Sequence, residues 1–179
     1  FFCDATQAIG KVPLDVNTDL IDMLCFSAHK FNGPKGIGVL YKKSGVKLEC
    51  LMHGGSQENG ERGGTSNTPG IVGLGEACRI AQDEFESNIK SLLSKKADLE
   101  KYYVANNIGQ INFKEVATAP HILSITIKDY EAEEFLILKS KEFVASTGSA
   151  CNSSIFEESH VLSALGMDNK SLRISLGYV

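Results

Sequence analysis

A long helical pattern in the middle of the sequence constrains the fold more than any other feature. Apolar residues recur at helical spacing just after Pro69-Gly70, namely Ile71, Leu74, Ala77, Cys78 and Ala81. The period continues among charged residues over 91–103. The stretch 71–104 therefore predicts one long helix, or two helices with a kink, that joins two bodies.

The segments on either side of this pattern predict strands and helices in alternation. Before it, strands are predicted over 1–5, 23–27 and 37–41, with a turn over 32–36 and an exposed loop over 54–64. The runs at 23–27 and 37–41 are typical of buried parallel strands. After it, strands are predicted over 122–127, 143–145 and 171–176, helices over 131–140 and 160–165, and a loop over 146–158. Because a strand begins at the first residue, we expect a fragment whose partner strands lie upstream.

Charge and cysteine content exclude several classes of protein. The formal net charge of -4 argues against a nucleic-acid-binding or membrane-surface protein, because both need a basic face. No apolar run approaches the roughly 20 residues that span a bilayer. None of the five cysteines forms a C-x-x-C pair and no Cys/His cluster has zinc spacing, so no metal site is predicted. The odd cysteine count without a disulfide pattern favours a reducing compartment, and we expect a cytoplasmic protein.

Two polar residues that follow predicted strands are candidates for chemistry. Lys30 lies just beyond the strand at 23–27, where a lysine can point into a cleft and provide the neutral amine that forms an imine. Local sequence supports a solvated lysine on a surface turn equally well. Asp4 ends the first strand, where a carboxylate can stabilise the protonated ring nitrogen of a cofactor. On local sequence alone, an aspartate that caps a turn is the stronger interpretation.

Cys151 differs from the other cysteines in its surroundings. Its neighbours over 146–154 are almost all small or polar, so we expect an exposed loop. Exposure suits a thiolate nucleophile that reacts and then moves. A loop cysteine without a function is the alternative. The other four cysteines are interpreted as packing residues.

Six short motifs occur in one order along the chain. They are Asp-Ala-Thr-Gln from residue 4, Ser-Ala-His-Lys from 27, Gly-Pro-Lys-Gly from 33, Arg-Gly-Gly-Thr from 62, Ser-Thr-Gly-Ser-Ala-Cys from 146 and Leu-Arg-Ile-Ser-Leu-Gly from 172. With these motifs the chain resembles the cysteine desulfurases that depend on pyridoxal 5'-phosphate (PLP) and are related to class V aminotransferases. The resemblance runs from the first residue to the last and corresponds to the C-terminal half of the family.

The resemblance implies an α/β fold, namely part of a PLP-dependent transferase of fold type I. Residues 1–75 would be the remaining part of the large PLP-binding domain, with the cofactor at the carboxyl ends of its strands. Residues 76–104 would be a long interdomain helix. Residues 105–179 would be the small C-terminal α/β domain, incomplete at its C-terminus.

The resemblance also implies roles for individual residues. Lys30 matches the lysine that binds PLP as a Schiff base, and Cys151 matches the cysteine that accepts sulfur. Asp4 matches the partner of the pyridine nitrogen, and Gln7 matches the residue that hydrogen-bonds the ring oxygen. The further implied roles are phosphate binding by Ser27 and His29, binding of the other subunit's cofactor phosphate by Thr65, and clamping of the substrate carboxylate by Arg173. We also expect His29 to be catalytic, whether it stacks on the cofactor or hydrogen-bonds it.

The implied reaction converts L-cysteine to L-alanine and leaves sulfur on Cys151 as a persulfide. A homodimer would pass this sulfur to an acceptor protein, for iron–sulfur cluster assembly or for thiolation. Two alternatives stay open: a related PLP enzyme such as a selenocysteine lyase or an aminotransferase, and a non-catalytic docking domain of the same fold. Because the family's phosphate loop and ring-stacking histidine precede the first residue here, we expect residues 1–179 alone to be poorly active or inactive.

Overall fold

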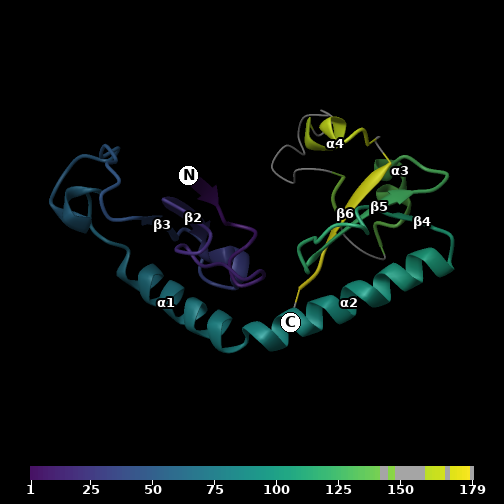
Figure 1. Cartoon of the computed structure of the whole chain (residues 1–179), viewed down its shortest axis with the longest axis horizontal. Coiled ribbons are helices and arrows are strands. Elements are labelled where there is room, and N and C mark those ends of the chain that lie inside the picture. Colours follow the sequence, from purple (N-terminus) through teal and green to yellow (C-terminus); the bar gives the residue numbers. More distant parts are fainter. Residues whose placement is uncertain (142–144, 148–159, 168–169, 178–179) are drawn as a thin grey trace. The chain divides into compact units, whose positions relative to one another are not determined.

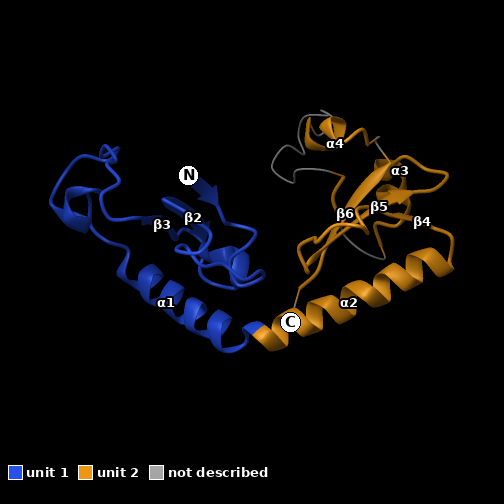
Figure 2. Cartoon of the chain, viewed as in Figure 1, with its two compact units in different colours: residues 1–85 blue, residues 86–179 orange. Residues whose placement is uncertain are grey.

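The computed structural model describes residues 1–141, 145–147, 160–167 and 170–177 of the chain (Figure 1). These residues form two compact units, 1–85 and 86–179, which Figure 2 colours separately. Each unit combines a three-stranded sheet with helices, and the predicted α/β class is confirmed. The separate interdomain segment at 76–104 stays a prediction. Among the described residues, no helix has both the length and the apolar character that crossing a membrane requires.

The first unit is built on the sheet β1-β2-β3. Strand β1 (Phe2–Asp4) runs parallel to β2 (Met23–Ser27), and β3 (Gly38–Lys42) runs antiparallel to β2. The prediction that the run at 37–41 is a parallel strand is therefore wrong. The short link between β2 and β3 is the physical reason, because a parallel partner needs a crossover of roughly a dozen residues or more.

The long helical pattern forms two helices, which was the second of the two predicted alternatives. Helix α1 (Thr68–Asp83) begins beside Pro69, where Asn67 accepts a hydrogen bond from the backbone N–H of Gly70 at 3.1 Å. Its helical geometry stops at Glu84, which has φ -99° and ψ 5°. Helix α2 (Phe85–Ala105) then begins at the next residue.

Two apolar clusters hold the first unit together. One joins α1 to the 3₁₀ turn η1 (Ala28–Phe31), and its buried members are Ala28, Phe31, Leu74 and Ala77. The other lies where β1 ends and β2 passes, and its buried members are Ala5, Ile21 and Leu24. The two clusters therefore anchor the segments that follow β1 and β2, which are the segments with the predicted cofactor ligands.

The second unit is built on the antiparallel sheet β4-β5-β6. Its strands are β4 (Gly109–Ile111), β5 (Ile122–Ile127) and β6 (Ser171–Ser175), and its helices after α2 are α3 (Ala132–Leu138) and α4 (His160–Ala164). All of these elements except β4 lie where the sequence predicts them. The predicted strand at 143–145 and the predicted loop at 146–158 fall largely outside the described residues.

Alternation along β5 separates an apolar face from a polar face. Leu123, Ile125 and Ile127 are almost fully buried in the core of the unit. That core also contains Tyr103, Ile111, Phe135, Leu172 and Ile174. The intervening residues, Ser124 and Thr126, lie on the other face. The second sheet therefore directs its polar side chains away from this core.

Candidate functional site

The two strands that carry predicted cofactor ligands end at the same edge of their sheet. β1 ends at Asp4 and β2 ends at Ser27, and parallel strands have their carboxyl ends on one side. The pairing continues past Asp4, where the N–H of Ala5 donates to the carbonyl of Cys25 at 2.8 Å. The structure therefore brings the segment with Asp4 and Gln7 beside the segment that leads from Ser27 to Lys30.

Lys30 lies on a turn whose backbone is firmly held. Ala28 and Phe31 are 0% and 3% exposed, whereas His29 and Lys30 between them are exposed. The turn closes at Asn32, which has the left-handed φ of 67°, and the next N–H donates to the carbonyl of Ala28 at 2.9 Å. The lysine amine is therefore open to a ligand while its backbone is fixed.

Asp4 is held in its charged form by hydrogen bonds. The Thr6 hydroxyl, then the Thr6 backbone N–H at 2.9 Å and the Cys25 thiol, lower the pKa of the Asp4 carboxyl, and slight burial opposes them. Burial, followed by the negative charge of Asp4, raises the pKa of the Cys25 thiol, so that it stays protonated and can donate. An ionised carboxylate at the same sheet edge as the segment with an exposed lysine fits a cofactor with a cationic ring nitrogen and an aldehyde.

Gln7 and Thr65 are both exposed, and neither side chain hydrogen-bonds another described residue. Gln7 follows Asp4 closely in the chain. Thr65 follows the loop predicted at 54–64, which contains the short turn η2 (Gln57–Gly60) and is closed where the N–H of Gly63 donates to the carbonyl of Met52 at 2.7 Å. Both side chains are therefore available to a ligand or to another subunit.

Lys11 is a residue that the sequence reasoning missed. Only 8% of it is exposed, and its ammonium donates to the backbone carbonyl of Lys30 at 2.8 Å. In the sequence it stands in a loop-like stretch between Gly10 and Val12, where a solvated lysine is the ordinary expectation. The pattern contains no sign of its burial, because burial here depends on the contact with the distant turn η1.

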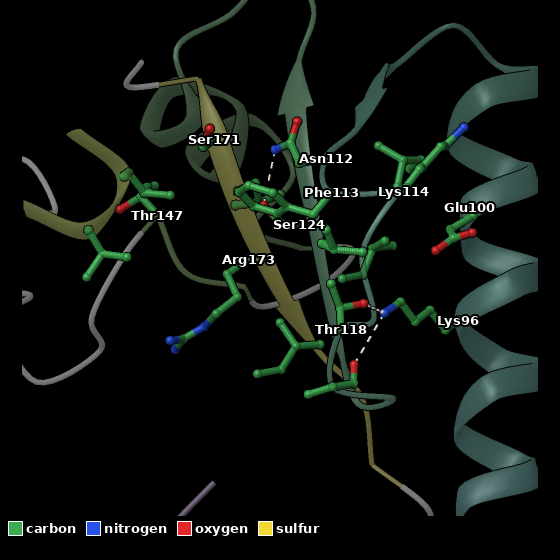
Figure 3. Close-up of a pocket in the computed structure, with 18 residues that line it drawn as sticks. Lys96, Glu100, Asn112, Phe113, Lys114, Thr118, Ser124, Thr147, Ser171 and Arg173 are labelled. Atoms are coloured by element: carbon green, nitrogen blue, oxygen red, sulfur yellow. Dashed lines mark hydrogen bonds between the residues drawn. The ribbon is translucent and has the colours of Figure 1, made fainter. Parts of the chain in front are cut away.

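Arg173 lies in the second unit, in the middle of β6. It lines a cavity of about 550 Å³, which Figure 3 shows together with Ser171, Ser124, Asn112 and Thr147. The Nε atom of Arg173 and the hydroxyl of Ser171 are buried and have no hydrogen-bond partner in the described part of the chain. A buried guanidinium nitrogen without a partner is costly, so this cavity suits an anionic group such as a carboxylate.

Other polar residues of this cavity already have partners. Asn112 donates from Nδ2 to the Ser124 hydroxyl at 3.1 Å and accepts from the Thr126 hydroxyl at 3.0 Å. On another wall, Lys96 of α2 donates to the Thr118 hydroxyl at 2.6 Å and to a backbone carbonyl (Figure 3). Burial lowers the pKa of the Lys96 ammonium. Among the described residues that line the cavity, the buried donors without a partner are therefore the Nε of Arg173 and the hydroxyl of Ser171.

The segment that precedes Cys151 begins beside Arg173. Ser146 and Arg173 form an antiparallel bridge, in which each backbone N–H donates to the other residue's carbonyl. Cys151 itself lies outside the described residues. Of the other predicted site residues, Asp4, Gln7, Ser27, His29, Lys30 and Thr65 belong to the first unit and Arg173 belongs to the second.

Comparison with known proteins gives consistent matches along the whole chain. The Aminotransferase class-V family matches residues 1–179. A cysteine desulfurase IscS from Methanosarcina thermophila is 44% identical over 182 residues, which cover 99% of this chain and 45% of that protein. A NifS-like protein from Rickettsia africae has an X-ray structure that matches with a TM-score of 0.87 and 28% identity, over 100% of this chain and 48% of that one. SspA in complex with cysteine matches with a TM-score of 0.73 and 35% identity, over 98% and 50% of the two chains.

The matches also agree in the share of each related protein that they cover. The chain spans less than half the length of the curated relatives it matches. The resemblance carried by the six motifs and the fold that it implies are both confirmed. Since the family pattern extends over every residue of the sequence, the chain belongs to the class-V aminotransferase family.

Proposed function

We propose that this chain is part of a PLP-dependent cysteine desulfurase, which converts L-cysteine to L-alanine and transfers the sulfur to an acceptor protein. The observation that carries the proposal is the shared edge of β1 and β2, where ionised Asp4 lies beside the segment with exposed Lys30. A cysteine substrate is supported by the similarity to cysteine desulfurases and to SspA, whose structure is a complex with cysteine.

The site residues of the first unit have the following roles in this proposal. Lys30 would hold the cofactor through its amine, and the same amine would remove the proton from Cα of the substrate. Asp4 would stabilise the protonated ring nitrogen, and Gln7 would hydrogen-bond the ring oxygen. Ser27 and His29 bind the phosphate. When bound, PLP supplies an electron sink for the negative charge that develops at Cα.

Substrate binding and sulfur transfer fall to the second unit. Arg173 pairs with the substrate carboxylate and orients the amino acid for proton removal. Cys151 attacks the substrate sulfur as a thiolate, so that an S–S bond forms, the substrate C–S bond breaks and its electron pair stays with the carbon, which takes up a proton. Cysteine and the Cys151 thiol thereby give alanine and a Cys151 persulfide, and an acceptor thiol then removes the outer sulfur. His29 remains a further catalytic candidate.

The proposal extends to the second subunit, the sulfur acceptor and the cellular location. Thr65 would contact the cofactor phosphate of the second subunit in a homodimer, which agrees with its exposed, unpartnered side chain. The acceptor would serve iron–sulfur cluster assembly or thiolation, and the protein would act in the cytoplasm. We also propose that residues 1–179 alone are poorly active or inactive, and a desulfurase assay on this polypeptide checks that point.

A pair of lysine variants of the full-length protein tests the proposed function. Lys30→Ala should abolish both the visible absorbance band of bound PLP and the formation of alanine from cysteine. Lys47→Ala, an exposed lysine of the same unit, should preserve both. Equal spectra and equal alanine formation in the two variants would rule out the proposed role of Lys30. Alanine formation from selenocysteine alone would favour the selenocysteine lyase alternative.

A further inference from the structure

The side chain of Lys11 is buried, and its ammonium contacts a backbone carbonyl. It lies within the first unit, 8% exposed, and donates at 2.8 Å to the carbonyl oxygen of Lys30. No carboxylate of the described residues forms a salt bridge with it. Burial, and then the positive charge of Lys30, lower the pKa of the Lys11 ammonium. A charge in this position is costly, and an apolar side chain of similar length would avoid the cost.

Lys11 belongs to the segment that starts directly after Asp4. The N–H of Ala8 donates to the carbonyl of Ala5 at 2.9 Å, and the N–H of Lys11 donates to the carbonyl of Ala8 at 2.9 Å. These bonds wind the segment into successive turns, so the position of Lys11 is set relative to Asp4. The same turns carry Gln7.

The acceptor of this hydrogen bond is part of the turn that presents the reactive amine. Buried Ala28 and Phe31 hold η1 from within, but the peptide after Lys30 has its carbonyl directed at Lys11. One buried side chain therefore connects the segment with Asp4 and Gln7 to the peptide unit of Lys30. It adds a second link, beyond the pairing of β1 with β2, between the two halves of the proposed cofactor site.

We propose that Lys11 is a positioning residue, which fixes the backbone of Lys30 relative to Asp4 so that one cofactor can engage both. This inference rests on the proposed function and adds a residue to it. Lys11 acts through Lys30 and does not itself touch the cofactor. Its role is to orient the turn, which explains why a costly buried charge stands where a methionine would pack.

Substitutions at Lys11 in the full-length protein test the inference. Lys11→Met removes the donor and keeps the apolar stem, whereas Lys11→Arg keeps a cationic donor. We expect Lys11→Met to bind PLP about tenfold more weakly, because the turn that presents Lys30 loses a hydrogen bond from a charged group that holds it in place. Thermal unfolding of its cofactor-free form should stay close to the wild-type temperature, because removal of the buried charge offsets loss of the hydrogen bond to the Lys30 carbonyl. Lys11→Arg should recover PLP binding at least in part, and Lys47→Met is the matched surface control.

The outcomes separate this inference from the proposed function. If the wild-type protein has no absorbance band that depends on Lys30, the proposed function fails and this inference fails with it. If that band is present, but Lys11→Met has wild-type PLP affinity and wild-type kcat, only the role of Lys11 is overturned. If Lys11→Met does not fold, Lys11→Gln decides in the same way, because its amide is too short to reach the same carbonyl. Weaker PLP binding in Lys11→Gln with recovery in Lys11→Arg supports the inference.

Discussion

Ser146 and Arg173 are paired through two backbone hydrogen bonds, of 3.1 Å from Ser146 N and 2.7 Å from Arg173 N. The bridge places the start of the segment that leads to Cys151 beside the strand with the proposed carboxylate clamp. Cys151 follows Ser146 by five residues in the sequence. The two second-unit residues of the proposed reaction are therefore connected through one short antiparallel contact, and this contact can be tested separately from the chemistry.

Ser146→Pro in the full-length protein should raise KM for cysteine roughly 2- to 10-fold, because proline removes the N–H that donates to the Arg173 carbonyl. Steady-state kinetics with circular dichroism as a folding check measure the effect. Ser146→Ala keeps both backbone bonds and should stay close to wild type. An unchanged KM in the proline variant would show that the bridge does not support Arg173.

Cys151→Ser should abolish sulfide release from cysteine and leave the visible absorbance band of bound PLP intact. A serine hydroxyl has nearly the shape of the thiol but is not a nucleophile toward sulfur at neutral pH. Cys78→Ser, in the exposed part of α1, is the matched control and should keep activity. Full sulfide release by Cys151→Ser would favour the alternative of a related PLP enzyme that cleaves the bond without a cysteine nucleophile, such as a selenocysteine lyase.

Gly33→Ala should destabilise the cofactor-free protein by about 1–3 kcal/mol, because the added methyl group would overpack a filled site. An added Cβ would lie 2.8 Å from the Ala28 Cβ, 2.9 Å from the Ala28 carbonyl and 3.1 Å from the Ala77 Cβ. Gly75→Ala is the opposite case, since no heavy atom lies within 4 Å of an added Cβ and the residue is inside α1. It should stabilise the protein by about 1 kcal/mol. Urea denaturation compares the two, and equal effects would contradict the packing described around η1.

The charge of Asp4 should contribute stability that disappears in acid. Its folded-state pKa is lowered from 3.8, so the contribution is present above that pH and is lost as the pH falls through the lowered value. Asp4→Asn should remove this part of the pH dependence. Thr6→Val should move the midpoint of the loss upward toward 3.8, because the Thr6 hydroxyl is the largest cause of the shift. Urea denaturation as a function of pH gives the midpoints, and an unmoved midpoint in Thr6→Val would contradict this origin.

Sequence patterns predicted those elements whose residues alternate or recur strictly. The six residues of β5 alternate between core and polar face, so the strand was predicted at its observed bounds. β4 was missed because it has only three residues and starts with Gly109, where an added Cβ would meet the Thr126 carbonyl at 2.3 Å. The direction of β3 was also missed, because strand direction depends on the connection and not on composition.

Some residues of the candidate site could be predicted from local sequence, whereas others are revealed only by the tertiary structure. Motif order identified Lys30 and Asp4, and the structure brings their two segments to one sheet edge. The sequence does not indicate the role of Lys11, because this side chain becomes buried only when η1 packs against its segment. Roles that need the cofactor, the second subunit or Cys151 stay predictions.

The closure between Met52 and Gly63 also has an evolutionary consequence. The carbonyl of Met52 accepts from the N–H of Gly63, and a Cβ on Gly63 would lie 2.8 Å from that same oxygen. The residues between them form a loop whose two ends are held together by this hydrogen bond. Insertions or deletions at its exposed tip, around Asn59, can therefore accumulate at low entropic cost without displacing Thr65. Lineages that diversify here can change the outer surface of the protein while the proposed cofactor ligands keep their spacing.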